Sequence, residues 1–251
     1  LLLPKKMYDR FHRDKRVQAA ELLLQERIPA RPVVMKRLSV AHAQPPEPRP
    51  AVSAAFREFV SPHTPAPEVC VLSNGSYTTV VTASGGGFSK YKGVAVSRWR
   101  EDFAKDDWGS YIYIRDVAQD TVWSPTFQPC RVPTDEYRVQ FSLDRATFRR
   151  ADGDFKTSLD ICVDPESDTE VRRLTISYTG NEERVVEITT FQEIALATQN
   201  VDESHPTFSK LFVETEYCGD AECLLARRRP RDKNDTPLWA VHTLTVSGRE
   251  G

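Results

Sequence analysis

Short runs in which apolar and polar residues alternate make up most of the chain after residue 67. The alternation is clearest in VRRLTISYTG and ERVVEITTF, where β-branched residues predominate, as in strands whose side chains point to opposite faces in turn. Turn pairs such as Asn74-Gly75 and Asp152-Gly153 separate the runs. The predicted strands are Val69–Leu72, Tyr77–Thr82, Val94–Arg98, Tyr111–Asp116, Thr121–Ser124, Tyr137–Ser142, Arg145–Arg150, Phe155–Val163, Val171–Tyr178, Arg184–Phe191, Leu211–Tyr217 and Leu238–Val246. Many short strands at this spacing predict a mainly β fold, a large antiparallel sandwich over residues 68–251.

Other patterns precede and interrupt these strands. Residues 1–28 contain apolar positions at helical spacing, which predicts one helix that ends at the following proline. Residues 29–67 hold nine of the seventeen prolines, which predicts an extended linker, with helix and strand both open for Val52–Val60. Residues 223–237 are predicted to form a basic loop bounded by proline, and the strand after this loop has no obvious partner.

The stretch from Val94 to Pro125 is rich in aromatic and charged residues and contains three of the four tryptophans. Flat aromatic faces beside acids and arginines suit a surface that contacts sugar C–H groups and hydroxyls. A glycine loop at Gly85–Gly87 is a second candidate substrate contact, with a plain flexible loop as the alternative. The candidate carbohydrate-binding residues are Arg98, Trp99, Asp102, Trp108, Tyr111, Tyr113, Arg115, Gly86 and Gly87. The alternative is a core hairpin whose tryptophans pack inward.

Composition excludes several classes of function. A net charge of −2 in 251 residues leaves no basic excess with which to bind nucleic acid. No apolar run approaches the ~20 residues of a membrane-spanning helix, so no membrane contact by this segment is expected. The five cysteines form no CxxC pair, which predicts neither a zinc site nor a disulfide framework and favours a reducing compartment. No catalytic motif, metal site or cofactor site is predicted.

Several motifs together resemble a known family. LSNGSYTTVVTASGGGFSKYKGVAVSRWRED, DDWGSYIYIRD and VWSPTFQP are similar to the N-terminal β-domain of family 94 glycoside phosphorylases, formerly glycosyltransferase family 36, which includes cellobiose phosphorylase. They resemble still more the corresponding region of cyclic β-1,2-glucan synthases. HPTFSKLFVETEY and DTEVRRLTISYTGNEERVVEITTF match the same region. The helical residues 1–28 resemble the tail of a preceding module of the synthases.

The resemblance implies a galactose mutarotase-like super-sandwich that packs against a helical catalytic barrel. The chain ends before that barrel, so the family's general acid has no counterpart here and the sandwich is expected to be incomplete at its C-terminus. The implied function is a noncatalytic carbohydrate-binding and scaffolding β-domain of a β-glucan-processing parent that uses UDP-glucose; the alternative is a purely structural module. The implied partners are β-linked glucan, the helical catalytic domain and a second copy in a homodimer. The parent is expected to be anchored in the inner membrane, with this segment on the cytoplasmic side.

Overall fold

The computed structural model describes Lys15 and residues 56–100, 106–204, 206–230 and 237–248. The chain divides into two units, Leu1–Ser53 and Ala54–Gly251, and the strands among the described residues belong to the second. The predicted helix in residues 1–28 lies outside the described residues apart from Lys15, which is helical, and so does most of the predicted linker.

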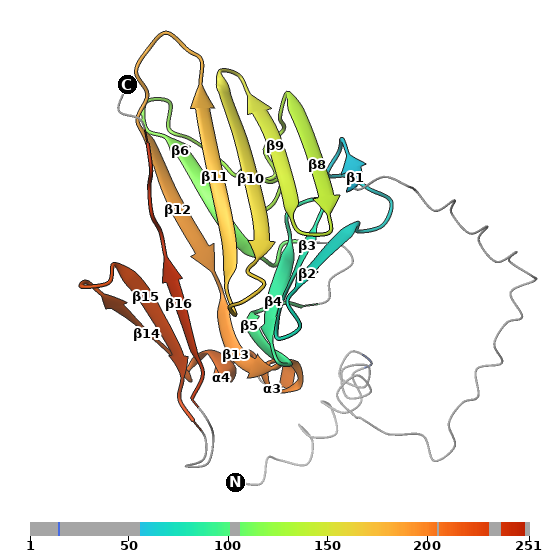
Figure 1. The fold of residues 1–251 in the computed structure, drawn as a ribbon, viewed down its shortest axis with the longest axis vertical. Helices are drawn as coiled ribbons and strands as arrows, with labels where there is room; N and C mark the ends of the chain where they lie inside the picture. The colour runs from blue at the N-terminus through green and yellow to red at the C-terminus, as the bar shows by residue number, and fades with distance from the viewer. Residues whose placement is uncertain (1–14, 16–55, 101–105, 205, 231–236, 249–251) are drawn as a thin grey trace, which may run out of the picture. The chain divides into compact units, whose positions relative to one another are not determined.

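The described strands of the second unit form four antiparallel sheets (Figure 1). The first contains β1 (Phe56–Phe59), β8 (Glu136–Ser142), β9 (Ala146–Asp152), β10 (Phe155–Val163) and β11 (Glu170–Tyr178), in that spatial order. The second has the order β12 (Val186–Gln192), β6 (Ser110–Asp116), β7 (Thr121–Trp123). The third has the order β13 (Ile194–Thr198), β5 (Val94–Ser97), β4 (Gly87–Tyr91), β3 (Tyr77–Thr82), β2 (Val69–Ser73). The fourth is the meander β14 (Val213–Cys218), β15 (Cys223–Arg228), β16 (Trp239–Thr243). Two short helices, α3 (Gln199–Ser204) and α4 (Pro206–Lys210), connect β13 to β14.

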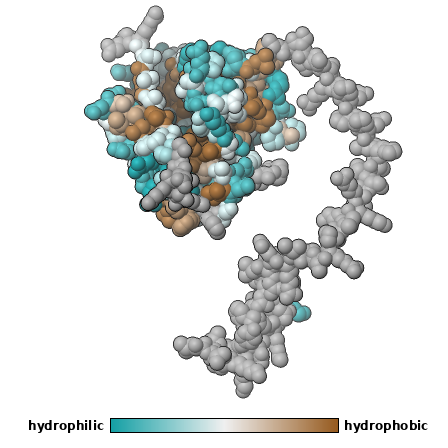
Figure 2. Space-filling view, turned by 60° about the horizontal axis from the view of Figure 1, so that its bottom comes forward, coloured by the Kyte–Doolittle hydropathy of each residue, from teal (hydrophilic) through white to brown (hydrophobic). Residues whose placement is uncertain are grey.

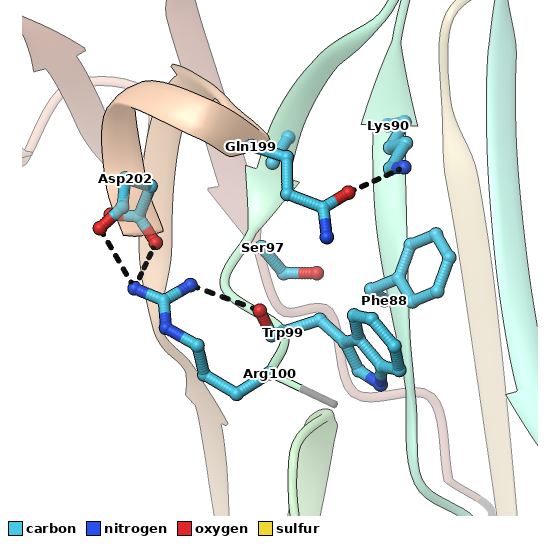
Figure 3. A pocket seen from close by; sticks show the side chains of 8 residues that line it. Phe88, Lys90, Ser97, Trp99, Arg100, Gln199 and Asp202 are labelled. Atoms are coloured by element: carbon cyan, nitrogen blue, oxygen red, sulfur yellow. Dashed lines mark hydrogen bonds and ion pairs between the residues drawn. The ribbon is translucent and has the colours of Figure 1, made fainter. Parts of the chain in front are cut away.

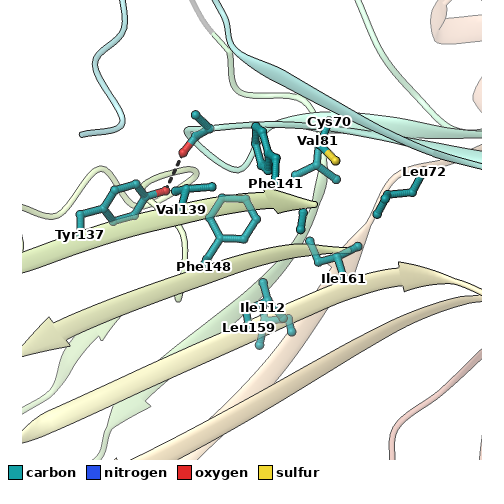
Figure 4. Close-up of a cluster of buried hydrophobic side chains, with 12 residues drawn as sticks. Cys70, Leu72, Val81, Ile112, Tyr137, Val139, Phe141, Phe148, Leu159 and Ile161 are labelled. Carbon is teal, nitrogen blue, oxygen red and sulfur yellow. Dashed lines mark hydrogen bonds between the residues drawn. The ribbon is translucent and has the colours of Figure 1, made fainter. Parts of the chain in front are cut away.

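The main core lies between the first and third sheets (Figure 4). Alternate residues of β8, β9 and β10 point inward, among them Val139, Phe148 and Ile161, none of which has exposed surface. They meet Leu72 and Val81 from β2 and β3. Complete burial of such side chains is worth about 1.5–3 kcal/mol each, so the alternation seen in the sequence is also the main source of stability.

A smaller core joins the first and second sheets. Ile114 of β6, Trp123 of β7 and Phe155 of β10 form its buried centre, with the Trp123 and Phe155 rings 5.3 Å apart. Trp123 therefore has the core role that the alternative interpretation gave to the tryptophans. The predicted mainly β, antiparallel fold is confirmed.

For Val52–Val60 the structure shows the strand alternative over Phe56–Phe59: β1 pairs with β8, so the β structure begins before residue 68. Three other strands differ from expectation. β4 follows directly from the glycine turn. β13 continues from β12 after one residue. Cys223–Arg228 is strand β15 and not a loop, because β14 pairs along one of its edges and β16 along the other. The last predicted strand therefore does have a partner.

Candidate functional site

The glycine turn between β3 and β4 lies against the residues that precede β6. The Gly87 amide donates a hydrogen bond to the Trp108 carbonyl oxygen (2.7 Å). The Asp106 carboxylate accepts hydrogen bonds from the Thr82 and Ser84 hydroxyls, and a Cβ on Gly86 would overlap that carboxylate. The structure thus brings together three predicted site residues, Gly86, Gly87 and Trp108. Close packing of backbone against Asp106 accounts for the glycines here.

Beside this turn, a shallow pocket opens between β4, β5 and α3 (Figure 3). The Trp99 ring packs against the Phe88 ring, with centroids 5.3 Å apart and ring planes at 52° to each other. Lys90 donates to the Gln199 side-chain oxygen at 3.4 Å and lies 4.9 Å from the centre of the Phe88 ring. The pocket has a volume of about 10 Å³, which is room for about one water molecule. A sugar ring can therefore contact its rim and not its interior.

Arg100 joins the pocket to the glycine turn. Its guanidinium pairs with Asp202 at 2.6 Å, donates to the Trp99 carbonyl oxygen at 3.0 Å, and lies 6.0 Å from the centre of the Trp108 ring. We call Phe88, Trp99, Arg100 and Trp108 the aromatic rim. All four are half-buried, so each retains some surface for a ligand.

Arg98, unlike Arg100, has a fully buried side chain. Its side chain is 2% exposed and holds Asp202, which is equally buried, with bonds of 2.9–3.2 Å. It also pairs with Glu193, which Lys210 contacts at 2.9 Å. Burial alone would raise the pKa of Asp202, but the bonds from Arg98 and Arg100 outweigh it and lower the pKa to about 2. Arg98 is thus a buried charge that fastens α3 to β5, and its guanidinium is not presented to solvent.

The candidates on β6 lie in different surroundings. Ile112, Ile114 and Asp116 are buried, as expected for residues on one face of a strand. Tyr111 is also buried, and its hydroxyl has no hydrogen-bond partner among the described residues. Burial first, and then the negative charges of Asp106 and Asp107, raise the pKa of Tyr111.

The far end of β6 is separate from the aromatic rim. Arg115 lies five residues, or about 17 Å, along the strand from Ser110. It pairs with Asp120 (2.7 Å) and Glu187 (2.9 Å). Tyr113 is half-buried, and Asp102 lies outside the described residues. Arg115 therefore contacts surface carboxylates at the end of β6 that pairs with β7, and not Trp99 or Trp108.

Within the described part of the chain, no cluster of three or more histidine, cysteine or acidic residues could hold a metal ion. The helices of the same part are too short or too polar to cross a bilayer. The site that the described residues form is an aromatic surface with charged neighbours.

Comparison with known proteins decides the family. A model of the glycosyl hydrolase 94 supersandwich domain matches residues 53–251. The chain belongs to this family. The match begins three residues before β1, so the family's domain includes the strand that sequence patterning placed in a linker. The resemblance identified from the sequence motifs is confirmed, as is the super-sandwich fold.

Three relatives give the family context. The cyclic β-(1,2)-glucan synthase NdvB of Rhizobium meliloti is 34% identical over 94% of this chain, which covers 8% of that protein. The N,N′-diacetylchitobiose phosphorylase of Vibrio furnissii is 27% identical over 64% of this chain and 21% of its own length. The 3-O-β-D-glucopyranosyl-β-D-glucuronide phosphorylase of Paenibacillus borealis is 26% identical over 53% of this chain and 17% of its own length. The supersandwich chain thus spans less than a quarter of each of these proteins.

Sequence reasoning missed the residues that organise the site from a distance. Asp202 and Gln199 of α3 lie about a hundred positions from their partners Arg98 and Lys90, and no local pattern marks such a pairing. Phe88 directly follows the glycine loop Gly85–Gly87 and was not recognised as a site residue. The strand Gly87–Tyr91 shows no clear alternation of apolar and polar residues, so no local pattern places Phe88 beside Trp99.

Proposed function

We propose that this chain is a noncatalytic, carbohydrate-facing supersandwich domain of a β-glucan-processing enzyme. Its aromatic rim contacts β-linked glucan, while a helical catalytic domain of the parent enzyme supplies the chemistry. The observation that carries the proposal is the rim itself, where two half-buried tryptophans flank an arginine. The names of the relatives support this, since one is a glucan synthase and the others are saccharide phosphorylases. From the family resemblance of the sequence motifs and the cysteine pattern, we further propose that the parent is membrane-anchored and that this domain lies on its cytoplasmic side.

The rim favours weak and extended contacts. Indole faces bind the C–H faces of pyranose rings, and Arg100 retains donors that can reach sugar hydroxyls. Because the pocket holds about one water (10 Å³), no ring is enclosed, and little of a ligand's surface is removed from water. A dissociation constant near 1 mM, worth about −4 kcal/mol, fits such a rim.

Calorimetric titration of the purified chain tests the proposal. Linear and cyclic β-1,2-glucans are the probes, and cellobiose is the control ligand. Saturable binding to the β-1,2-glucans that is lost in Trp99→Ala and Trp108→Ala supports the proposal. Trp239→Ala is the matched control, because Trp239 is 51% exposed on β16, outside the rim, and its binding should equal that of the original chain. Circular dichroism confirms that each variant is folded.

A purely structural role is the second candidate, and the fourth sheet favours it. Exposed apolar residues occur on both of its faces. Tyr217 and Leu224 are cross-strand partners and so lie on one face. Val241 lies on the other face, because it is adjacent in sequence to His242, the partner of Leu224 on β16. Figure 2 shows hydrophobic side chains reaching the surface in several places between hydrophilic ones. Such surface suits contact with the helical domain or with a second copy. Absence of glucan binding, together with a dimer in light scattering that Val241→Glu dissociates, would make this role the better account.

A further inference from the structure

Two cysteines face each other at the end of the β14–β15 hairpin. Cys218 is the last residue of β14 and Cys223 the first of β15, and the strand register makes them direct partners. Directly opposed residues of antiparallel strands have Cα atoms about 4.5–5.5 Å apart. A disulfide spans Cα separations of about 4.4–6.8 Å. The backbone therefore already holds these residues at a separation that a disulfide can bridge.

The remaining cysteines have no such arrangement. Cys70 is paired in register with Val81, and Cys162 with Val171, while Cys130 lies between β7 and β8. In the strands that the structure describes, Cys218 and Cys223 are thus the one pair of cysteines in cross-strand register. The pairing occurs at the last position of the β14–β15 ladder, next to a turn, and Cys223 also pairs with Thr243 of β16.

The two thiols differ in access. Cys223 is buried, whereas Cys218 is half-buried. Burial first, and then the charge and hydrogen bond of Cys218, raise the pKa of Cys223. A reagent in solution therefore meets Cys218 first, with Cys223 behind it as the resolving thiol.

We propose that Cys218 and Cys223 form a reversible disulfide when the chain meets a low-molecular-weight disulfide such as oxidised glutathione. The Cys218 thiolate attacks one sulfur of the reagent, which gives a mixed disulfide and releases one molecule of the reduced thiol. Cys223 then loses its proton, and its thiolate displaces the second molecule of thiol and forms the Cys218–Cys223 bond. Two protons and two electrons leave the protein thiols, and the disulfide of the reagent is reduced to two thiols.

The bond affects more than the hairpin. β15 also pairs with β16, and His242 of β16 lies 2.8 Å from the Thr190 hydroxyl of β12. A crosslink in β14–β15 thus restrains a sheet whose third strand contacts the body of the sandwich. Because crosslinking removes chain entropy from the opened hairpin, amide exchange in β14 and β15 is expected to slow about tenfold after oxidation.

The test is thiol counting and peptide mapping on the whole 251-residue chain after equilibration with mixtures of reduced and oxidised glutathione. Five free thiols are expected to fall to three, with a Cys218–Cys223 crosslinked peptide that dithiothreitol reverses. In Cys223→Ser the reaction should stop at glutathione bound to Cys218. Cys162→Ser is the matched control, since Cys162 is also half-buried but has no cysteine opposite, and it should still form the crosslink.

Three results would overturn the proposal. The first is five unreacted thiols in glutathione mixtures that oxidise a model dithiol peptide. The second is glutathione that remains on Cys218 in the original chain, because then Cys223 cannot resolve it. The third is crosslinking that involves Cys70, Cys130 or Cys162 instead.

Discussion

Removing the charge of Asp202 is expected to destabilise the fold strongly. Asp202 and Arg98 are each 2% exposed, and Arg98 has only one other carboxylate partner among the described residues, Glu193. Removal of one partner leaves a buried charge without full compensation, which costs about 3–5 kcal/mol. We therefore expect Asp202→Asn to lower the free energy of unfolding by about 3 kcal/mol at pH 7, because Arg100 and Glu193 retain part of the network.

The pKa of Asp202 provides a second, independent measure. Its pKa falls from 3.8 in the unfolded chain to about 2 in the folded one, so its charge stabilises the fold fully above about pH 5 and loses that contribution as the pH falls towards 2. A shift of this size corresponds to about 2 kcal/mol, and about half of it is lost by pH 3. The difference in stability between the original chain and Asp202→Asn should therefore shrink by about 1 kcal/mol between pH 6 and pH 3.

The assay is urea unfolding followed by tryptophan fluorescence at pH 7, 6, 5, 4 and 3. Glu187→Gln is the matched control, because Glu187 pairs with Arg115 on the surface with more than half of its side chain exposed; such pairs are worth about 0–1 kcal/mol. A difference between original chain and Asp202→Asn that stays constant across this pH range would refute the reasoning. So would an Asp202→Asn variant no less stable than Glu187→Gln.

Three further predictions concern backbone, core and ionisation. Gly87→Ala should lower the free energy of unfolding by more than about 3 kcal/mol, because φ is +147° and a Cβ would lie 1.9 Å from a carbonyl oxygen of β3. Gly93 also has a positive φ, but a Cβ there would meet open space. Gly93→Ala should therefore cost about 1 kcal/mol in urea unfolding. Phe148→Ala should cost about 3–5 kcal/mol in the same assay, since Phe148 is fully buried, whereas Leu143→Ala, at a position 98% exposed, should change stability by less than about 0.5 kcal/mol. Burial raises the pKa of Tyr137, so its neutral form stabilises the fold below about pH 10, and this contribution is lost as the pH rises further. Tyr137→Phe should therefore reduce the fall in stability between pH 9 and 11. A fall as large as that of the original chain would contradict the assignment.

Strand alternation predicted most of the fold because one face of each strand is apolar. Tyr77–Thr82 and Phe155–Val163 have the predicted bounds. β4 did not show this pattern, because its inward residue Ser89 is polar, yet has no exposed surface. Ser89 is accommodated by a 2.6 Å hydrogen bond to Glu170 of β11, a partner 81 residues away. β15 was missed for a related reason, since its arginines indicate a loop while its pairing on both edges makes it a central strand.

The site was predictable in composition but not in arrangement. Trp99 and Trp108, two candidates from the aromatic stretch, both contact the Arg100 guanidinium in the structure. The sequence could not show which arginine lies at the aromatic rim, because Arg98 and Arg100 are two positions apart and carry the same charge. Burial separates them: Arg98 is 2% exposed and Arg100 21%.

Asp202 both stabilises the fold and positions part of the aromatic rim. It binds Arg98 behind the pocket and Arg100 at its edge, so one carboxylate both fastens α3 to β5 and fixes the guanidinium beside Trp108. Helix α3 itself has only six residues and would not form in isolation. The rim therefore depends on a helix that the buried ion pair keeps in place, and this explains why the residues that hold the rim are less recognisable in the sequence than the tryptophans that form it.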